Sequence, residues 1–406
     1  MRLARPLLAL LGGRTALGAA MRLGAMGATG GAAAFSMSTA PVMAAEPTLS
    51  SLNPSVRVVT YNVLSSHLCE PTHYTACAPE DLDPPTRLRR VQEQLRPHID
   101  AGAVLCLQEL SDVWVGALVP YFEERGYTLV SGRYGRKFNG YMGVALAWPS
   151  ARYESEAVDI SRAADTVAPW PAAPEKGGGG GGVLGSIQSR WRRLVRWAKG
   201  AKPPLEPWTE AERRQNVLVS AKLRCKRSGR LFAVTTYHMP CLFGSDKKCQ
   251  VMTIHAAIAA RHAKTFANGV PYVLAGDFNF KPDSAQYALV TNGGLAADHP
   301  RAPPPRAEGA WAPCAAAAPL RSAYAIKDGA EPEFTNLAFS SWSKEPFSGC
   351  LDYIFLSEEW GVGAVKPLKK LSEEERKSYP SWDEPSDHVM IWADVEMGDA
   401  RPAAAA

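Results

Sequence analysis

The feature of the sequence that most constrains its fold is a long series of short apolar runs with the alternation of β-strands. The first, Val56–Tyr61, is rich in β-branched residues. Strands are predicted at 56–61, 103–107, 127–131, 144–148, 217–223, 231–236, 272–275, 353–356 and 389–395, and helices at 87–99, 114–125 and 252–267. Many short strands with a few helices predict an α/β fold, a four-layer αββα sandwich of two mainly antiparallel sheets flanked by helices, in one domain over residues 54–397.

The first 45 residues have the composition of a targeting segment. They contain four arginines, no acidic residue precedes Glu46, and Ala, Gly, Leu and Ser dominate. Basic, acid-poor segments are typical of organelle transit peptides. We therefore predict an intracellular, mitochondrial protein, with plastid or cytoplasm as alternatives. A secretory signal and a disordered segment of no consequence remain open alternatives for residues 1–45.

Two segments, 161–210 and 300–318, are predicted to be insertions into this domain, and residues 398–406 a disordered tail. The first contains six consecutive glycines, Gly177–Gly182, typical of a flexible linker. Residues 187–202 then carry arginines around an apolar helical face, as in helices that contact an anionic membrane surface or nucleic acid. Docking of this helix on its own domain is an equal alternative. The second insertion is rich in Pro and Ala and is predicted to be a loop.

The bulk properties are those of a globular enzyme. The chain is 46% hydrophobic and 21% charged, and it has no run of about eighteen strongly apolar residues, so no transmembrane span is expected. The net charge of +5 is weak evidence for a polyanionic substrate. The eight cysteines show no CxxC pair and no Cys/His zinc spacing. Cys106 lies within an apolar run, as a small hydrophobic residue would, and we expect reduced thiols and hence an intracellular protein. We expect a monomer.

Six short strings place a polar residue at the end of an apolar run. They are Thr60-Tyr61-Asn62, Leu107-Gln108-Glu109, Thr236-Tyr237-His238-Met239-Pro240, Gly276-Asp277-Phe278-Asn279, Leu351-Asp352-Tyr353-Ile354 and Ser386-Asp387-His388. Strand ends at one edge of a sandwich converge, so these polar groups are expected in one cleft. Singly, each string has a simpler explanation, since an Asp-His pair is usually a surface loop and Gly-Asp-Phe-Asn could be a turn. The full ordered set is what argues for a site.

The chemistry expected of this cleft is metal-assisted hydrolysis. Carboxylate and amide oxygens suit Mg²⁺, with Mn²⁺ able to substitute, and the absence of thiolates argues against zinc. A divalent ion polarises a phosphoryl oxygen, while His and Asp side chains manage protons.

In this order, the six strings resemble the signature of the endonuclease/exonuclease/phosphatase superfamily, from about Val56 to Glu396. The Thr-Tyr-Asn-Val-Leu, Leu-Gln-Glu, His-Met-Pro and Leu-Ala-Gly-Asp-Phe-Asn strings most resemble the branch that holds carbon catabolite repressor deadenylases, nocturnin and 2′-phosphodiesterases. Some superfamily members carry a carboxylate two residues after the Asn, where this chain has Leu64. A second metal site built on that position is therefore not expected.

The resemblance implies a role for each residue. The metal ligands would be Asn62, Glu109 and Asp387. The catalytic residues would be His238, Asp277, Asn279, Asp352 and His388. Asp277 would orient or deprotonate the attacking water, Asn279 would bind a phosphate oxygen, and Asp352 would orient His388.

Substrate contacts are predicted for Asn62, Asn279 and Arg133, with Arg136 and Lys137 beside the last, although a solvated basic loop is an equal alternative there. Phe280 and Tyr141 could stack on a base, but core packing is the favoured interpretation of both.

The substrate class implied is RNA or a related nucleotide. The first hypothesis is a magnesium-dependent 3′-exoribonuclease that removes poly(A). Alternatives are a 2′,5′-phosphodiesterase, a dinucleotide phosphatase, and a sphingomyelinase or inositol phosphatase type of hydrolase. A catalytically silent scaffold is the alternative outside enzymes, and the six intact strings give it little support.

Overall fold

The computed structural model describes residues 55–167, 169–171, 205–306, 312–314, 318–341, 345–370 and 378–398. The chain divides into Met1–Glu46, which lies outside these residues, and Pro47–Ala406. The predictions for residues 1–45, the glycine run, the basic segment 187–202 and the tail beyond Gly398 also fall outside the described residues and stay predictions.

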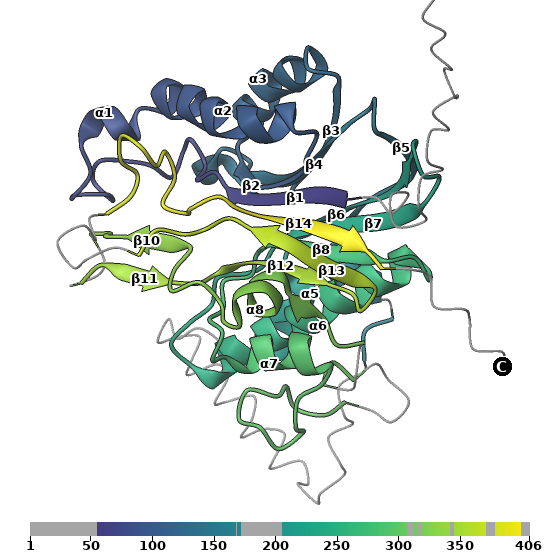
Figure 1. The fold of residues 1–406 in the computed structure, drawn as a ribbon. Helices are drawn as coiled ribbons and strands as arrows, with labels where there is room; N and C mark the ends of the chain where they lie inside the picture. Colours follow the sequence, from purple (N-terminus) through teal and green to yellow (C-terminus); the bar gives the residue numbers. More distant parts are fainter. Residues whose placement is uncertain are drawn as a thin grey trace, which may run out of the picture. The chain divides into compact units, whose positions relative to one another are not determined.

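Two six-stranded sheets form the centre of the molecule (Figure 1). The first has the order β13 (Trp360–Val365), β14 (Ile391–Met397), β1 (Ser55–Asn62), β2 (Val104–Leu110), β4 (Gly143–Pro149) and β3 (Tyr127–Arg133). The second has the order β5 (Tyr153–Arg162), β6 (Val217–Cys225), β7 (Leu231–His238), β8 (Tyr272–Asp277), β12 (Asp352–Leu356) and β9 (Arg321–Ser322). Only β1–β2 and β7–β8 pair in parallel among the described strands, so the prediction of mainly antiparallel sheets is confirmed.

Helices cover the outer face of each sheet (Figure 1). On the first sheet these are α1 (Pro79–Leu82), α2 (Pro84–Asp100) and α3 (Asp112–Glu123). On the second they are α5 (Pro207–Arg213), α6 (Asp246–Ala267) and α7 (Ala285–Asn292). α8 (Ala323–Asp328) instead packs Ala323 and Tyr324 into the core between the sheets. Three short elements complete the set: the 3₁₀ turns η2 (Lys137–Asn139) and η3 (Ala163–Val167) and the hairpin β10 (Asn336–Ala338) with β11 (Phe347–Gly349). The predicted four-layer sandwich is confirmed. No helix in the described ranges is long and apolar enough to cross a bilayer.

Strict alternation along the strands separates three apolar cores. In β1, Val56 and Val58 pack between the two sheets, whereas Val59 and Tyr61 pack under α2 and α3. In β7, Val234 faces the first sheet and Tyr237 faces the helices of the second. Because side chains alternate with period two, the last residue on each inner face is fixed by the residues before it.

The strands that the sequence did not predict are mostly edge strands. β5 has little buried apolar surface and exposes Val158 and Ile160, and β13 contains two glycines, so neither has a clear apolar period. The described ends of segment 161–210 belong to the fold, since Val167 and Trp208 join the core beneath the second sheet.

Gly276 is required where β7 and β8 meet, immediately before Asp277. A Cβ at this position would lie 1.9 Å from the carbonyl oxygen of Tyr237. The adjacent pair in the ladder is His238 with Asp277. A side chain at Gly276 would therefore separate the strands that carry two predicted site residues.

We predict that Gly276→Ala lowers the free energy of unfolding by about 3 kcal/mol, because the new methyl group overlaps strand backbone. Gly361→Ala in β13 is the matched control, since its Cβ would find its nearest atom at 3.7 Å, and it should change stability by less than about 1 kcal/mol. Urea unfolding of the three proteins measures both. Equal midpoints for the two variants would contradict this explanation.

Candidate functional site

Polar side chains end the inner faces of four strands at the same edge of the sandwich. Asn62, His238, Asp277 and Asp352 each follow or precede apolar inner-face residues with period two, in β1, β7, β8 and β12 respectively. All four are nearly inaccessible, with exposed fractions of 0–6%. The folded chain thus gathers groups from distant parts of the sequence, as the strand-end argument predicts.

Glu109 reaches this cleft through a β-bulge. Alternation alone would direct it toward α3, because Leu105 and Leu107 pack there. The register of β2 against β4 shifts between Gln108 and Leu110, and Glu109 has a φ of 59°. Bulges re-aim side chains at functional sites at the cost of backbone strain. The carboxylate consequently turns inward, with Oε1 3.1 Å from Asn62 Nδ2.

His388 and Asp352 form a buried dyad. His388 Nδ1 lies 2.7 Å from Asp352 Oδ2, and the Thr335 hydroxyl donates to the same oxygen at 2.6 Å. Burial lowers the pKa of His388, but the carboxylates of Asp352 and Asp277 outweigh it and raise the pKa well above its ordinary value. The imidazole is therefore held as a cation, with Nε2 left to face the cavity.

His238 lies opposite, between a tyrosine and a carboxylate. Its Nδ1 is 2.5 Å from the Tyr134 hydroxyl, and its Nε2 is 3.3 Å from Asp277 Oδ2. Burial raises the pKa of Tyr134 well above its usual value, so this hydroxyl keeps its proton. The carboxylate beside Nε2 favours a proton on that nitrogen, which leaves Nδ1 to accept from Tyr134.

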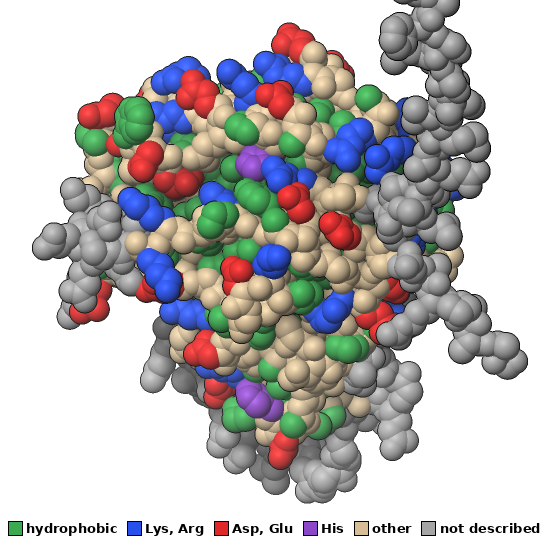
Figure 2. Space-filling model, in the orientation of Figure 1, with side chains coloured by type: hydrophobic (Ala, Val, Ile, Leu, Met, Phe, Trp, Pro, Cys, Tyr) green, Lys and Arg blue, Asp and Glu red, His purple; other side chains and the backbone are tan. Residues whose placement is uncertain are grey.

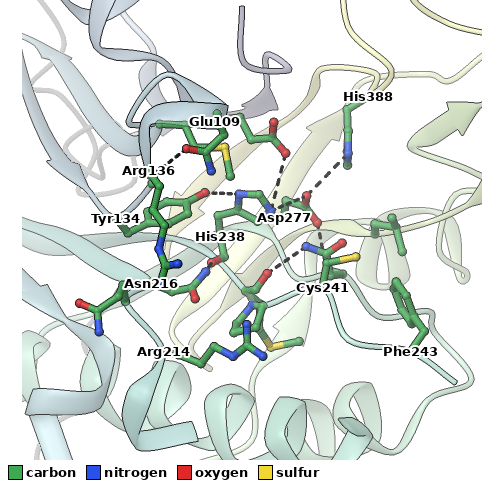
Figure 3. A pocket seen from close by; sticks show the side chains of 18 of the residues that line it. Glu109, Tyr134, Arg136, Arg214, Asn216, His238, Cys241, Phe243, Asp277 and His388 are labelled. Atoms are coloured by element: carbon green, nitrogen blue, oxygen red, sulfur yellow. Dashed lines mark hydrogen bonds and ion pairs between the residues drawn. The ribbon is translucent and has the colours of Figure 1, made fainter. Parts of the chain in front are cut away.

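Asp277 is the centre of the cluster (Figure 3). Its Oδ1 accepts from the backbone N–H of Asn279 at 2.9 Å, and its Oδ2 accepts from Asn62 Nδ2 at 3.0 Å. His388 Nε2 lies 3.6 Å from Oδ2 on the other side. With His238 Nε2 at 3.3 Å, N–H groups from four segments of the chain thus surround this carboxylate.

The remaining predicted residues have different positions. Asn279 lines the cavity, and its Nδ2 donates to Met239 O at 2.9 Å. Asp387 also lines it and accepts from the Tyr74 hydroxyl at 2.9 Å. Arg133 lies outside the main cavity, paired with Asp112 at 2.8 Å.

The two aromatic residues considered for base stacking differ. Phe280 is 2% exposed and packs against Phe278 and Tyr353, so core packing is its role. Tyr141 is 48% exposed, and the core-packing interpretation is wrong for it.

One cavity of about 790 Å³ is lined by six of the predicted residues: Glu109, His238, Asp277, Asn279, Asp387 and His388. Glu109, Asp277 and Asp387 are acidic residues of its lining, and the two histidines lie on either side of Asp277. Arg136, Arg214 and Asn216 line it on the side away from His388 (Figure 3). Arg213 and Glu210 also line the cavity, and Glu210 pairs with Arg214 at 2.6 Å. A volume of this size is within the range of small-ligand sites, about 300–1,000 Å³.

The acidic residues of the lining fit a hard divalent cation. Asp277, Asp352 and His388 offer ligand atoms within 4.8 Å of one another, but Asp352 Oδ2 already serves His388 and Thr335. Three carboxylates therefore remain for a cation: Glu109, Asp277 and Asp387. The amide oxygen of Asn62 accepts from Leu64 N–H at 3.0 Å, so Asn62 turns its N–H toward the carboxylates, and its role as a ligand stays a prediction.

The sequence matches the Endonuclease/Exonuclease/phosphatase family over residues 59–388. The chain belongs to this family. Its members include nucleases, phosphodiesterases and phosphatases, so the chain is a phosphoric ester hydrolase by family, as the sequence predicted. The match covers every predicted metal and catalytic residue from Asn62 to His388.

Three similar proteins illustrate the branch. 2′,5′-Phosphodiesterase 12 of Homo sapiens is 25% identical over 355 residues, which cover 84% of this chain and 51% of that protein. The CCR4-Not complex 3′-5′-exoribonuclease subunit Ccr4 of Emericella nidulans is 32% identical over 138 residues, 32% of this chain and 19% of that protein. The structure of ANGEL2, a 2′,3′-cyclic phosphatase, with adenosine-2′,3′-vanadate superposes with a TM-score of 0.60 at 20% identity, covering 85% and 96% of the two chains. This chain spans about half the length of the 2′,5′-phosphodiesterases that it matches.

Two residues that support the site carry no signal in the sequence. Thr335 donates to Asp352 and Tyr134 contacts His238, yet neither stands in a recognisable string.

The sequence predicts Arg87 only as part of a helix. It is 0% exposed, and its guanidinium donates to Val63 O, Leu64 O and Pro385 O at 2.5–2.7 Å.

Another buried carboxylate, Glu384, contacts Tyr61, the neighbour of Asn62 in β1. Tyr61 donates its hydroxyl to Glu384 Oε1 at 2.7 Å. Burial raises the pKa of Glu384 to about 7, although Lys366 and the Tyr61 hydroxyl act in the opposite direction. The folded protein therefore holds this proton more tightly than the unfolded chain does.

We predict that Glu384 makes the protein less stable as pH rises. A folded pKa above the unfolded one contributes stability that is complete below about pH 4.5 and is lost as pH passes through 7. Glu384→Gln stays neutral and still accepts from Tyr61. The stability of this variant relative to the natural protein should rise by about 3 kcal/mol between pH 4.5 and 8, measured by urea unfolding along a pH series. A difference that does not change with pH would show that Glu384 ionises normally.

Proposed function

We propose that this chain is a magnesium-dependent phosphodiesterase that hydrolyses short adenylate-containing RNA or related oligonucleotides. The observation that carries the proposal is the cavity lined by Glu109, Asp277 and Asp387, in which a protonated His388 lies 3.6 Å from the Asp277 carboxylate. Three carboxylates repel a phosphate unless a cation intervenes, and hard oxygen donors select Mg²⁺, with Mn²⁺ able to substitute.

The 2′,5′ linkage is the first candidate for the scissile bond. The relatives that cover 84% of this chain are named 2′,5′-phosphodiesterase 12, and the ANGEL2 complex holds an adenosine with vanadate at the 2′ and 3′ positions. Removal of a 3′,5′-linked poly(A) end is the second candidate, favoured by the Ccr4 similarity over a third of the chain. Both substrates present a terminal adenylate with a free 2′ or 3′ hydroxyl.

The shape of the charge distribution favours recognition within the cavity. Lys and Arg side chains alternate with Asp and Glu over the described part of the face in Figure 2. The net charge of +5 is thus not gathered in a single patch on that face. Arg136, Arg213 and Arg214 instead line the cavity. Arg214 pairs with Glu210, and the exposed side chains of Arg136 and Arg213 can attract phosphate.

The residues divide the reaction between them. When bound, the cation would be held by Glu109, Asp277 and Asp387 and would supply Lewis acidity toward the phosphate. Asp277 accepts a hydrogen bond, and then a proton, from the attacking water, while Asn62 and the Asn279 N–H keep its carboxylate in place. His388, charged by its contact with Asp352, donates from Nε2 to a phosphate oxygen. His238, held by Tyr134, donates from Nε2 on the opposite side, toward the phosphate or the leaving oxygen. No covalent enzyme intermediate is needed.

We expect hydrolysis of 2′,5′-linked triadenylate, and more slowly of a 3′,5′-linked adenylate oligomer, when Mg²⁺ is present. EDTA should stop both reactions and added Mg²⁺ or Mn²⁺ should restore them. Product chromatography with sphingomyelin, inositol phosphates and NADPH in parallel measures the preference. Turnover of a lipid headgroup without turnover of either oligonucleotide would overturn the proposal, and no turnover of any substrate would favour a silent scaffold.

Two substitutions separate proton transfer from cation binding. His388→Asn should lower kcat by about 10²–10⁴-fold, since it removes the charged donor, without raising the Mg²⁺ requirement. Glu109→Gln should raise the half-saturating Mg²⁺ concentration by about tenfold or more. Thermal unfolding checks that both proteins remain folded. Equal Mg²⁺ dependence in the two variants would contradict the separate roles of His388 and Glu109.

A further inference from the structure

A second cavity of about 300 Å³ adjoins the catalytic one. The two share four lining residues: Tyr134, Gly135, Arg136 and Gln215. The second cavity is completed by Arg133, Tyr141, Arg162 and Val217. Its volume matches the lower bound for small-ligand pockets, about 300 Å³. A chain of linked nucleotides could therefore extend from one cavity into the other past Arg136.

Arg136 is the cation available at this junction. Arg133 pairs with Asp112, and Arg162 pairs with Asp165 while also donating to Glu212 O. Among the described residues that line the second cavity, Arg136 alone of the three arginines has no carboxylate partner. Its side chain is exposed, and Figure 3 draws it on the opposite side of His238 from His388. The guanidinium is thus free to bind a phosphate away from the catalytic centre.

The loop between β3 and β4 holds Arg136 and Tyr141 in fixed positions. The Arg136 backbone N–H donates to Asn139 Oδ1 at 2.6 Å, and the Arg136 carbonyl accepts from Tyr141 N at 2.9 Å. Asn139 is tied in turn to the segment after β1, because the Ser65 hydroxyl donates to its carbonyl at 2.9 Å. Tyr141 has a φ of 53° and keeps 48% of its surface exposed. At Arg136 and Tyr141 these hydrogen bonds use only backbone atoms, so both side chains can be replaced without disrupting the loop.

We propose that the second cavity binds one further nucleotide of the substrate strand, next to the two that the scissile linkage joins. Arg136 holds the phosphate between this nucleotide and its neighbour, and Tyr141 stacks on its base. Charge-assisted hydrogen bonds and base stacking are the interactions with which proteins bind single strands. The proposal deepens the oligonucleotide function proposed above and rests on it. It implies that three nucleotides are the shortest substrate of full activity.

The test compares kcat/KM for the adenylate dimer ApA, the 5′-phosphorylated dimer pApA and the trimer ApApA, in whichever linkage the natural protein cleaves faster. In the natural protein, kcat/KM for ApApA should exceed that for ApA by about tenfold or more. Arg136→Gln should remove most of this advantage of the trimer, by raising KM for ApApA. Tyr141→Asn, which tolerates the positive φ, should reduce it about fivefold. Lys327→Gln, an exposed change on α8, is the control and should keep the full gain.

Three results would overturn the proposal. They are equal kcat/KM for dimer and trimer in the natural protein, an equal loss on both substrates in Arg136→Gln, and a gain for pApA as large as that for ApApA. The last result would mean that the second cavity binds a terminal phosphate and that the base of the third nucleotide contributes nothing.

Binding to the Asp277→Asn protein, measured by calorimetry with the same three compounds, tests the second cavity apart from turnover. Tighter binding of ApApA than of ApA, lost on adding Arg136→Gln, supports the subsite, and equal affinities overturn it. A natural protein that turns over none of these compounds would instead count against the proposed function, while the affinities still decide the subsite.

Discussion

A buried polar link between the two sheets sets the geometry of the whole site. The Thr60 hydroxyl donates to Gln108 Oε1 at 3.2 Å, and Gln108 Nε2 donates across the interface to Thr236 Oγ1 at 3.0 Å. All three residues are 0% exposed. Since a buried polar group without a partner is costly, one sheet cannot slide on the other without breaking this link. The next inner-face residues, Asn62 of β1 and His238 of β7, must then lie at the same height along the two sheets. Their polar side chains are thereby brought to the same edge of the sandwich.

The sequence predicts this convergence well because period two is simple. Once Val56 and Val58 are assigned to the inner face, Asn62 follows, and the same reasoning places Asp277 after Val273 and Ala275. Glu109 is different. Its string identifies it as a site residue, yet alternation directs it away from the cleft, and only the bulge in β2 turns it inward. A bulge depends on the partner strand β4, so a local pattern in β2 does not reveal it.

Buried charge marks the limit of what the sequence predicts. Arg87 stands beside Arg89 and Arg90, two arginines of the same helix that form ion pairs with carboxylates, and nothing in its neighbours separates it from them. In the fold its guanidinium packs over Trp114. It also donates hydrogen bonds to Val63 O, one residue after Asn62, and to Pro385 O, two residues before Asp387. α2 thereby fixes the relative positions of two loops that carry site residues. That role exists only when three distant segments are assembled.

The distribution of charge within the cavity fits a cation at one end, as proposed above, and none at the other. The carboxylates of Glu109, Asp277 and Asp387 are held by neutral donors, among them the Ser65 N–H and the Tyr74 hydroxyl. Neutral donors orient a carboxylate without cancelling its charge, and the charge of His388 is already paired with Asp352, so this end remains negative and repels phosphate. At the far end Arg136 supplies positive charge from the chain itself. In the proposed complex, a strand with two phosphates would therefore place the scissile group at the cation and the neighbouring phosphate at Arg136.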